Sequence, residues 1–143
     1  GQLDNNISCL GSSDGAVTFN VADFVTSYDY SVTGPAAFSG TAETANAIPL
    51  TGLAAGTYTI IVTDNDTNCT ATTDVIVTAP PAALAITNLS VIDLSCSTSG
   101  TVPGSVTITA VDGWGGFEYE LEDPSGATVG PQSANSFTGV LDT

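Results

Sequence analysis

The stretch Gly56-Thr57-Tyr58-Thr59-Ile60-Ile61-Val62-Thr63-Asp64 decides the fold. Tyr58, Ile60 and Val62 occur at every second position, and they alternate with Thr57, Thr59 and Thr63. Side chains of a β-strand point alternately to the two faces of a sheet, so this pattern predicts a strand with one buried and one polar face. Aromatic and β-branched residues are also those that strands favour.

The same alternation recurs along the chain, with turn-forming residues between the runs. Val17, Phe19 and Val21 form one such run, and a second begins at Tyr28. A helical period is found nowhere, and the composition is rich in Ser, Thr, Gly and Val. These features predict an all-β protein.

A proline pair divides the chain. Pro80 and Pro81 lie within Ala79-Pro80-Pro81-Ala82-Ala83, where strand signals stop, and they remove two backbone donors and stiffen the chain. We therefore predict a first β-sandwich repeat over residues 1–79, a linker over 80–83 and a second repeat over 84–143.

The two halves resemble each other. Four landmarks of the first half recur 87, 89, 89 and 87 residues later: Cys9 and Cys96, Gly15 and Gly104, Tyr28 and Phe117, Thr51 and Thr138. The predicted architecture is thus two tandem repeats of the immunoglobulin or fibronectin type III kind.

The second repeat is expected to be incomplete. It ends before any equivalent of residues 56–64 and Cys69, so two strands are missing from it. Truncation of the segment is the preferred explanation. The alternatives are that the continuing chain supplies the strands or that a neighbouring molecule donates one.

All the charged side chains of the sequence are acidic. The chain has 15 Asp and Glu, no Lys or Arg and no His, which gives a formal net charge of −15 at pH 7. Phosphate backbones are bound through Lys and Arg, so nucleic acid is excluded as a partner, and so are anionic membrane surfaces. No apolar run approaches the roughly 20 residues of a membrane-spanning helix, so no membrane insertion is expected in this segment.

The absence of Lys and Arg has two readings. An exposed surface polymer would gain resistance to proteases that cut after these residues, whereas a salt-adapted organism would carry an acidic bias in all its proteins. Catalysis has little support, because no His, Lys or Arg is present and no paired-carboxylate motif stands out. We therefore predict that the chain is not an enzyme and requires no cofactor.

Residues from Cys9 to Cys69 resemble the SprB-type repeats of very large surface adhesins in gliding Bacteroidetes. The motifs that carry the resemblance are Ser8-Cys9-Leu10-Gly11, Ser13-Asp14-Gly15-Ala16-Val17, the stretch from Leu53 to Asp64, and Asn68-Cys69. The resemblance implies secretion by a type IX system, exposure on the outer cell surface, and an adhesive or stalk role. It brings no catalytic residues.

Two cysteines lie near opposite ends of the first repeat. In an oxidising exterior we expect Cys9 and Cys69 to form a disulfide, which would close a loop of about 60 residues and contribute about 4 kcal/mol. The alternative is two buried thiols. Cys96 would be left without its partner, which would belong to the missing strands.

Asp64, Asp66 and Asn68 form the best candidate for a metal site. Oxygen side chains at alternate positions of a turn can converge on Ca²⁺, a hard cation that takes oxygen ligands. The alternative is an ordinary hairpin turn, where Asp and Asn are favoured in any case. Calcium is the one cofactor that the motifs suggest.

Trp114 is the candidate ligand contact, because it lies between glycines that would leave its ring open to a sugar. The alternative, which we prefer, is a Trp that covers the end of the sandwich or fills the interface between the repeats. Glu118, Glu120 and Glu122 would share one face of a strand, most simply a solvated outer face.

The function expected is a structural or adhesive repeat segment of a very large secreted cell-surface protein, forming a stalk or filament. Its partners would be neighbouring repeats, surface glycans or a substratum. Two alternatives remain: a carbohydrate-binding β-sandwich module with Trp114 as platform, and a filament subunit that assembles by strand donation.

Overall fold

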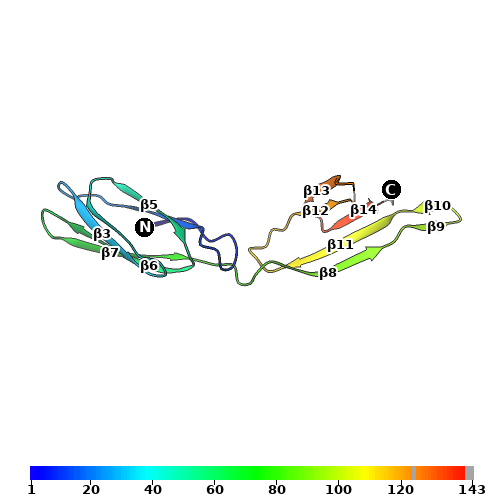
Figure 1. The fold of residues 1–143 in the computed structure, drawn as a ribbon, viewed down its shortest axis with the longest axis horizontal. Helices are drawn as coiled ribbons and strands as arrows, with labels where there is room; N and C mark the ends of the chain where they lie inside the picture. Colours follow the sequence, from blue (N-terminus) through cyan, green and yellow to red (C-terminus); the bar gives the residue numbers. More distant parts are fainter. Residues whose placement is uncertain (124, 141–143) are drawn as a thin grey trace. The chain divides into compact units, whose positions relative to one another are not determined.

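The computed structural model describes residues 1–123 and 125–140, and it is an all-β protein, as predicted (Figure 1). The described residues contain strands and turns but no helix, and hence no helix that could cross a membrane. The chain separates into unit 1, Gly1–Pro81, and unit 2, Ala82–Thr143. The division falls within the segment 80–83 that the prolines marked as a linker.

Unit 1 consists of two antiparallel sheets. The first contains three strands in the order β1 (Gln2–Asn5), β2 (Gly15–Asn20), β5 (Ala47–Leu53). The second contains four strands in the order β4 (Phe38–Glu43), β3 (Tyr28–Thr33), β6 (Gly56–Asp64), β7 (Thr70–Val77). The arrangement is that of a β-sandwich, and the finer assignment to an immunoglobulin or fibronectin type stays a prediction.

The core of unit 1 lies between the inner faces of these sheets. The alternation that opened the sequence analysis places Tyr58 and Ile60 inward, with 0% and 1% of their surfaces exposed, while Ile61 between them is 37% exposed. The buried residues of this core are Ile7, Val17, Phe19, Val32, Leu50, Leu53, Tyr58, Ile60, Val75 and Val77. Four of these ten come from β6 and β7, so this hairpin supplies much of the core.

Two buried tyrosines have their hydroxyl groups satisfied. The Tyr28 hydroxyl donates to the carbonyl oxygen of Ala45 at 2.6 Å, and the Tyr58 hydroxyl donates to that of Ala54 at 3.0 Å. Burial raises the pKa of both phenols. The rings therefore fill the core without leaving a polar atom unpaired.

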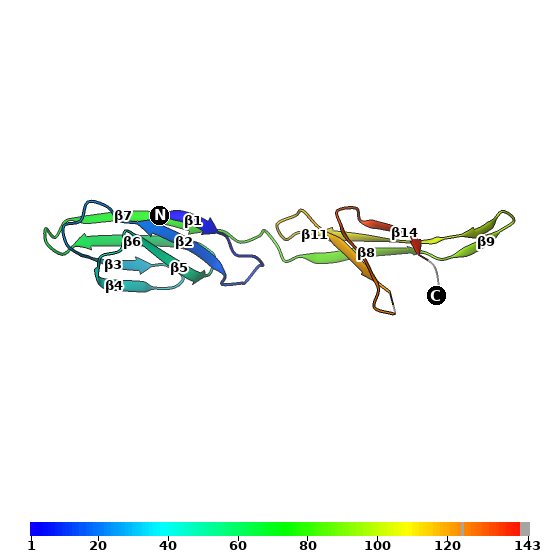
Figure 2. The same cartoon turned by 90° about the horizontal axis from the view of Figure 1, so that it is seen from above.

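The described residues of unit 2 form three antiparallel sheets. The largest has the order β14 (Ser136–Val140), β11 (Gly104–Val111), β8 (Ala85–Ile92), and β8 and β11 run side by side in both views (Figures 1 and 2). The other two are hairpins: β9 (Ser95–Ser97) with β10 (Gly100–Val102), and β12 (Tyr119–Glu122) with β13 (Thr128–Gln132).

The large sheet of unit 2 repeats the first sheet of unit 1 in register. In unit 1, Leu3 and Leu50 lie opposite Val17 of β2, one on each side of this strand. In unit 2, Val91 and Phe137 lie opposite Val106 of β11 in the same way. In both sheets the central strand shifts register after its first glycine.

The extra residue at this shift is a glycine in both units. Gly52 has φ 73° and Gly139 has φ 78°, a left-handed conformation that glycine adopts without steric cost. The shared bulge explains why Thr-Gly followed by an apolar residue recurs in the two halves.

We expect Ile60→Ala to lower the free energy of unfolding by about 2–4 kcal/mol, because it opens a cavity in the unit 1 core. The neighbouring change Ile61→Ala removes the same atoms from a partly exposed site and should cost less than about 1 kcal/mol. Urea denaturation of both variants, followed by circular dichroism of the tyrosines, measures the difference. Equal costs would contradict the assignment of Ile60 to the inner face.

Candidate functional site

The turn between β6 and β7 lies at one end of unit 1. Asp64 closes it at the backbone: its N–H donates to the carbonyl of Cys69 at 2.9 Å, and its carbonyl accepts from the N–H of Asn68 at 2.9 Å. Asn68 has φ 57°, a left-handed conformation that Asn tolerates better than most residues. The Asp and Asn residues of this stretch therefore satisfy the requirements of the turn itself.

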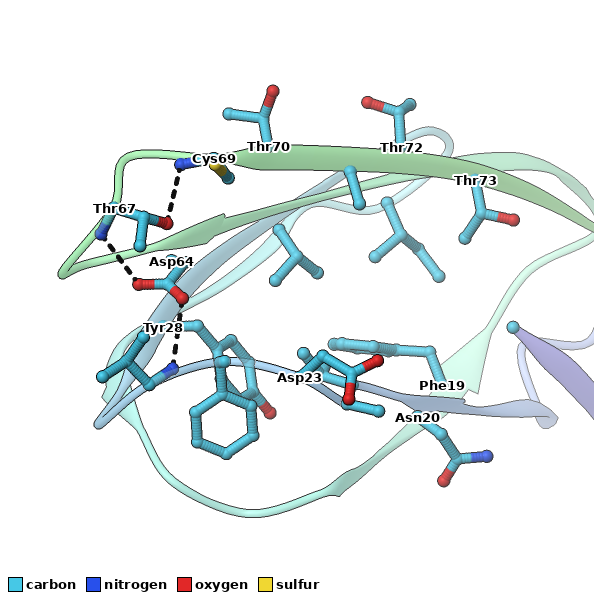
Figure 3. A pocket seen from close by; sticks show the side chains of 18 residues that line it. Phe19, Asn20, Asp23, Tyr28, Asp64, Thr67, Cys69, Thr70, Thr72 and Thr73 are labelled. Carbon is cyan, nitrogen blue, oxygen red and sulfur yellow. Dashed lines mark hydrogen bonds between the residues drawn. The ribbon is translucent and has the colours of Figure 1, made fainter.

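The Asp64 carboxylate accepts three backbone N–H groups, and its hydrogen bond with Thr67 is drawn in Figure 3. One oxygen accepts from Asp66 at 2.7 Å and Thr67 at 3.1 Å, and the other accepts from Val25 at 3.1 Å. These hydrogen bonds, with that from Thr67 the largest contribution, hold the pKa of Asp64 below its usual value.

Two further side chains fasten the loop before β3 to this turn. The Asp66 carboxylate accepts from the N–H of Thr26 at 3.0 Å and from its hydroxyl. The Asn65 side-chain amide donates to the Ser27 hydroxyl at 3.1 Å and to the Asp29 carboxylate at 2.9 Å. The turn thus acts as a clamp on residues 25–29.

The predicted calcium ligands Asp64, Asp66 and Asn68 do lie on one turn. Both carboxylates, however, accept hydrogen bonds from N–H and O–H donors, which compete with a cation for their oxygens. Within residues 1–123 and 125–140, no group of three or more His, Cys, Asp or Glu is placed to hold a metal ion. Calcium binding by this turn stays a prediction.

A pocket of about 600 Å³ opens beside the turn (Figure 3). Its apolar residues include Phe19, Val21, Tyr28, Ile60 and Val62. Polar residues also line it, among them Asn20, Asp23, Thr70, Thr72 and Thr73. The pocket can hold a ligand with an apolar body and hydroxyl groups, and its lining contains no His, Lys or Arg.

The pocket lies beside the last residues of β2, Phe19 and Asn20. In unit 1 the first pair between β1 and β2 is Gln2 opposite Thr18. In unit 2 the equivalent pairing continues to Ala85 opposite Val111. Sequence reasoning missed the pocket because its walls come from four strands, and only their register brings them together.

The predicted disulfide between Cys9 and Cys69 is wrong. Cys9 lies two residues after Ile7, whose N–H donates to the carbonyl oxygen of Thr78 just after the end of β7. Cys69 lies just before the start of β7. The eight residues of β7 separate the two ends by about 25 Å, whereas bonded cysteines have Cα atoms about 4–7 Å apart. Cys9, Cys69 and Cys96 are all free and exposed, so the alternative of two buried thiols is also wrong.

Trp114 lies in the loop between β11 and β12 and is 52% exposed. The corresponding loop of unit 1 presents Val25, which is 63% exposed. Both loops contain an Asp in the left-handed conformation, Asp23 with φ 63° and Asp112 with φ 65°. The two loops therefore share a left-handed Asp at equivalent positions, and each exposes an apolar side chain.

Comparison of the chain with protein-family models, with curated proteins and with solved structures gives no match. The candidate site is thus defined by geometry alone. That geometry contains a clamp built from carboxylates and a neighbouring pocket with a mixed lining.

We expect Asp64→Asn to destabilise unit 1 at pH 7, because the amide replaces an anionic acceptor of three N–H groups. A carboxyl whose folded pKa is lowered stabilises the fold above its unfolded pKa of about 3.9 and loses that contribution as the pH falls through the folded value. The difference in melting temperature between wild type and variant should therefore shrink below about pH 4. A difference that is constant from pH 7 to pH 2 would contradict this assignment.

Proposed function

We propose that the chain is a structural segment of a secreted surface protein built from tandem β-sandwich repeats. The observation that carries the proposal is the repetition of the β1-β2-β5 sheet as the β8-β11-β14 sheet, with the same register and the same glycine bulge. Repeated units joined by short linkers are typical of proteins that span distance. The resemblance to SprB-type repeats supports a place on the outer cell surface.

Charge supports the same role. With a formal net charge of −15 and no basic residue, neighbouring copies repel one another and remain soluble when crowded. The partners of the segment would be the neighbouring repeats of the same chain, and surface glycans or a substratum.

Surface exposure can be tested on the source cells. An antiserum against residues 1–143 should label intact cells, and trypsin treatment of those cells should leave the labelled segment uncut because it contains no Lys or Arg. A protease that cuts after aromatic residues serves as the control for access. Labelling only after the cells are broken open would overturn the proposal.

A carbohydrate-binding module is the second candidate, and the half-exposed ring of Trp114 is the observation that favours it. Indole faces stack on sugar rings, and an Ala in this position would remove the platform. If this function holds, Trp114→Ala should weaken binding on a glycan array at least about tenfold, which corresponds to about 1.4 kcal/mol.

Val25→Ala is the matched control for that experiment, because Val25 is the exposed apolar residue of the equivalent loop in unit 1. It should leave glycan binding unchanged. An array without hits, or equal loss in both variants, would remove this candidate.

A further inference from the structure

Unit 2 leaves most of its large apolar side chains in solvent. Every residue of β8 is exposed, including Ile86 at 69%, Leu89 at 60% and Val91 at 56%. The only large apolar residue described as buried in unit 2 is Phe137, at 4%. A sheet face of this size without cover is unusual in a folded domain and marks a contact surface.

Two other apolar positions of unit 2, Leu94 and Leu121, correspond to residues that are buried in unit 1. Ile7 is 1% exposed, whereas Leu94, which holds its place in the Ile-Ser-Cys and Leu-Ser-Cys motifs, is 40% exposed. Likewise Val32 is 1% exposed, while Leu121 at the same position of β12 is only partly buried. The sequences thus conserve apolar character between the units, but only unit 1 covers it.

What covers this face in unit 1 is the β6–β7 hairpin. Beyond its share of the core, β6 pairs with the edge of β3, so that Ile60 lies opposite Val32. Val75 of β7 lies beside Gly1, together with Ile60 and Val17. By strand register, Leu89 of unit 2 occupies the place of Gly1, so its side chain points to where this hairpin would be.

The edge available for such a hairpin is the one on β12. Within the described part of unit 2, β12 pairs with β13 alone, as β3 pairs with β4. The second edge of β3 carries β6, and the corresponding edge of β12 carries no described strand. The backbone groups on that edge can accept an antiparallel strand.

We propose that unit 2 is an acceptor for a β-hairpin of the β6–β7 type, supplied in cis, directly after β14 in the same polypeptide. The hairpin pairs with β12 and places an Ile60-like residue opposite Leu121. Its second strand covers Leu89 and Val91 with valines that correspond to Val75 and Val77.

A cis source follows from the connection in unit 1. Only Ala54 and Ala55 separate β5 from β6 there, so the closing strand follows its sheet at once in the sequence. A second copy of this chain is a poor donor, because its own β6 and β7 already form the core of unit 1. The inference rests on the repeat architecture behind the proposed function.

The test appends a copy of residues 57–79 after Thr143 of the full chain, because the 87-residue offset makes Thr143 the equivalent of Gly56. The control carries the same extension with Ile60→Asp and Val75→Asp in the appended copy. Hydrogen exchange of unit 2 amides is compared between the two, with unit 1 amides as the internal reference. The extension should slow exchange in β8, β11 and β12 by about tenfold or more relative to the control, and should reduce the binding of a dye specific for exposed apolar surface.

A third chain carries the intact extension together with Leu121→Asp, which removes the apolar contact on β12 and should abolish the protection. Equal exchange rates in the extended chain and its control would overturn the proposal that unit 2 accepts a hairpin. Protection that requires high protein concentration and accompanies dimerisation would overturn the proposal that the hairpin comes from the same polypeptide. These results do not depend on where the protein resides, so failure of the hairpin and failure of the surface role are distinguishable.

Discussion

Burial of apolar side chains between two facing sheets is the interaction on which this structure depends. In unit 1 the inner faces of β2 and β5 meet those of β3, β6 and β7, and the residues between them are almost fully buried. The described part of unit 2 has the strands that correspond to the first sheet and to one edge of the second, and most of its large apolar residues remain exposed. In unit 1 the β6–β7 hairpin supplies four of the ten buried core residues, and the described part of unit 2 contains no equivalent of this hairpin.

The carboxylates of this protein form hydrogen bonds instead of ion pairs with basic side chains. No Lys, Arg or His is present, so their partners are N–H and O–H donors. Thr18 and Thr59 donate their hydroxyl hydrogens to Asp4 and Asp74 at 2.7 Å. Such neutral donors contribute modestly at an exposed site, but they stabilise turns and need no partner of opposite charge.

The lowered carboxyl pKa values have the same origin. The pKa of Asp14 is lowered first by the side-chain hydrogen bond to Ser8, that of Asp29 by the N–H of Ala42, and that of Asp123 by Ser125. Each lies in a turn or at a strand end, where backbone donors would otherwise lack acceptors. Acidic residues therefore stabilise the fold through hydrogen bonds in addition to setting its surface charge.

The sequence by itself determined the all-β class and the inner and outer faces of β6, because the two faces of a strand appear in the sequence as a period of two. It also determined the match between the halves, because a repeat appears as a nearly constant offset between similar residues. It also marked Asp64 and Asp66 as turn residues. Tertiary structure alone decided the distance between Cys9 and Cys69, since β7 places them at opposite ends although both lie near the limits of the unit. It also decided the pocket beside Tyr28 and the clamp on Val25, because both arise from register between strands that are far apart along the chain, and local pattern carries no information on register.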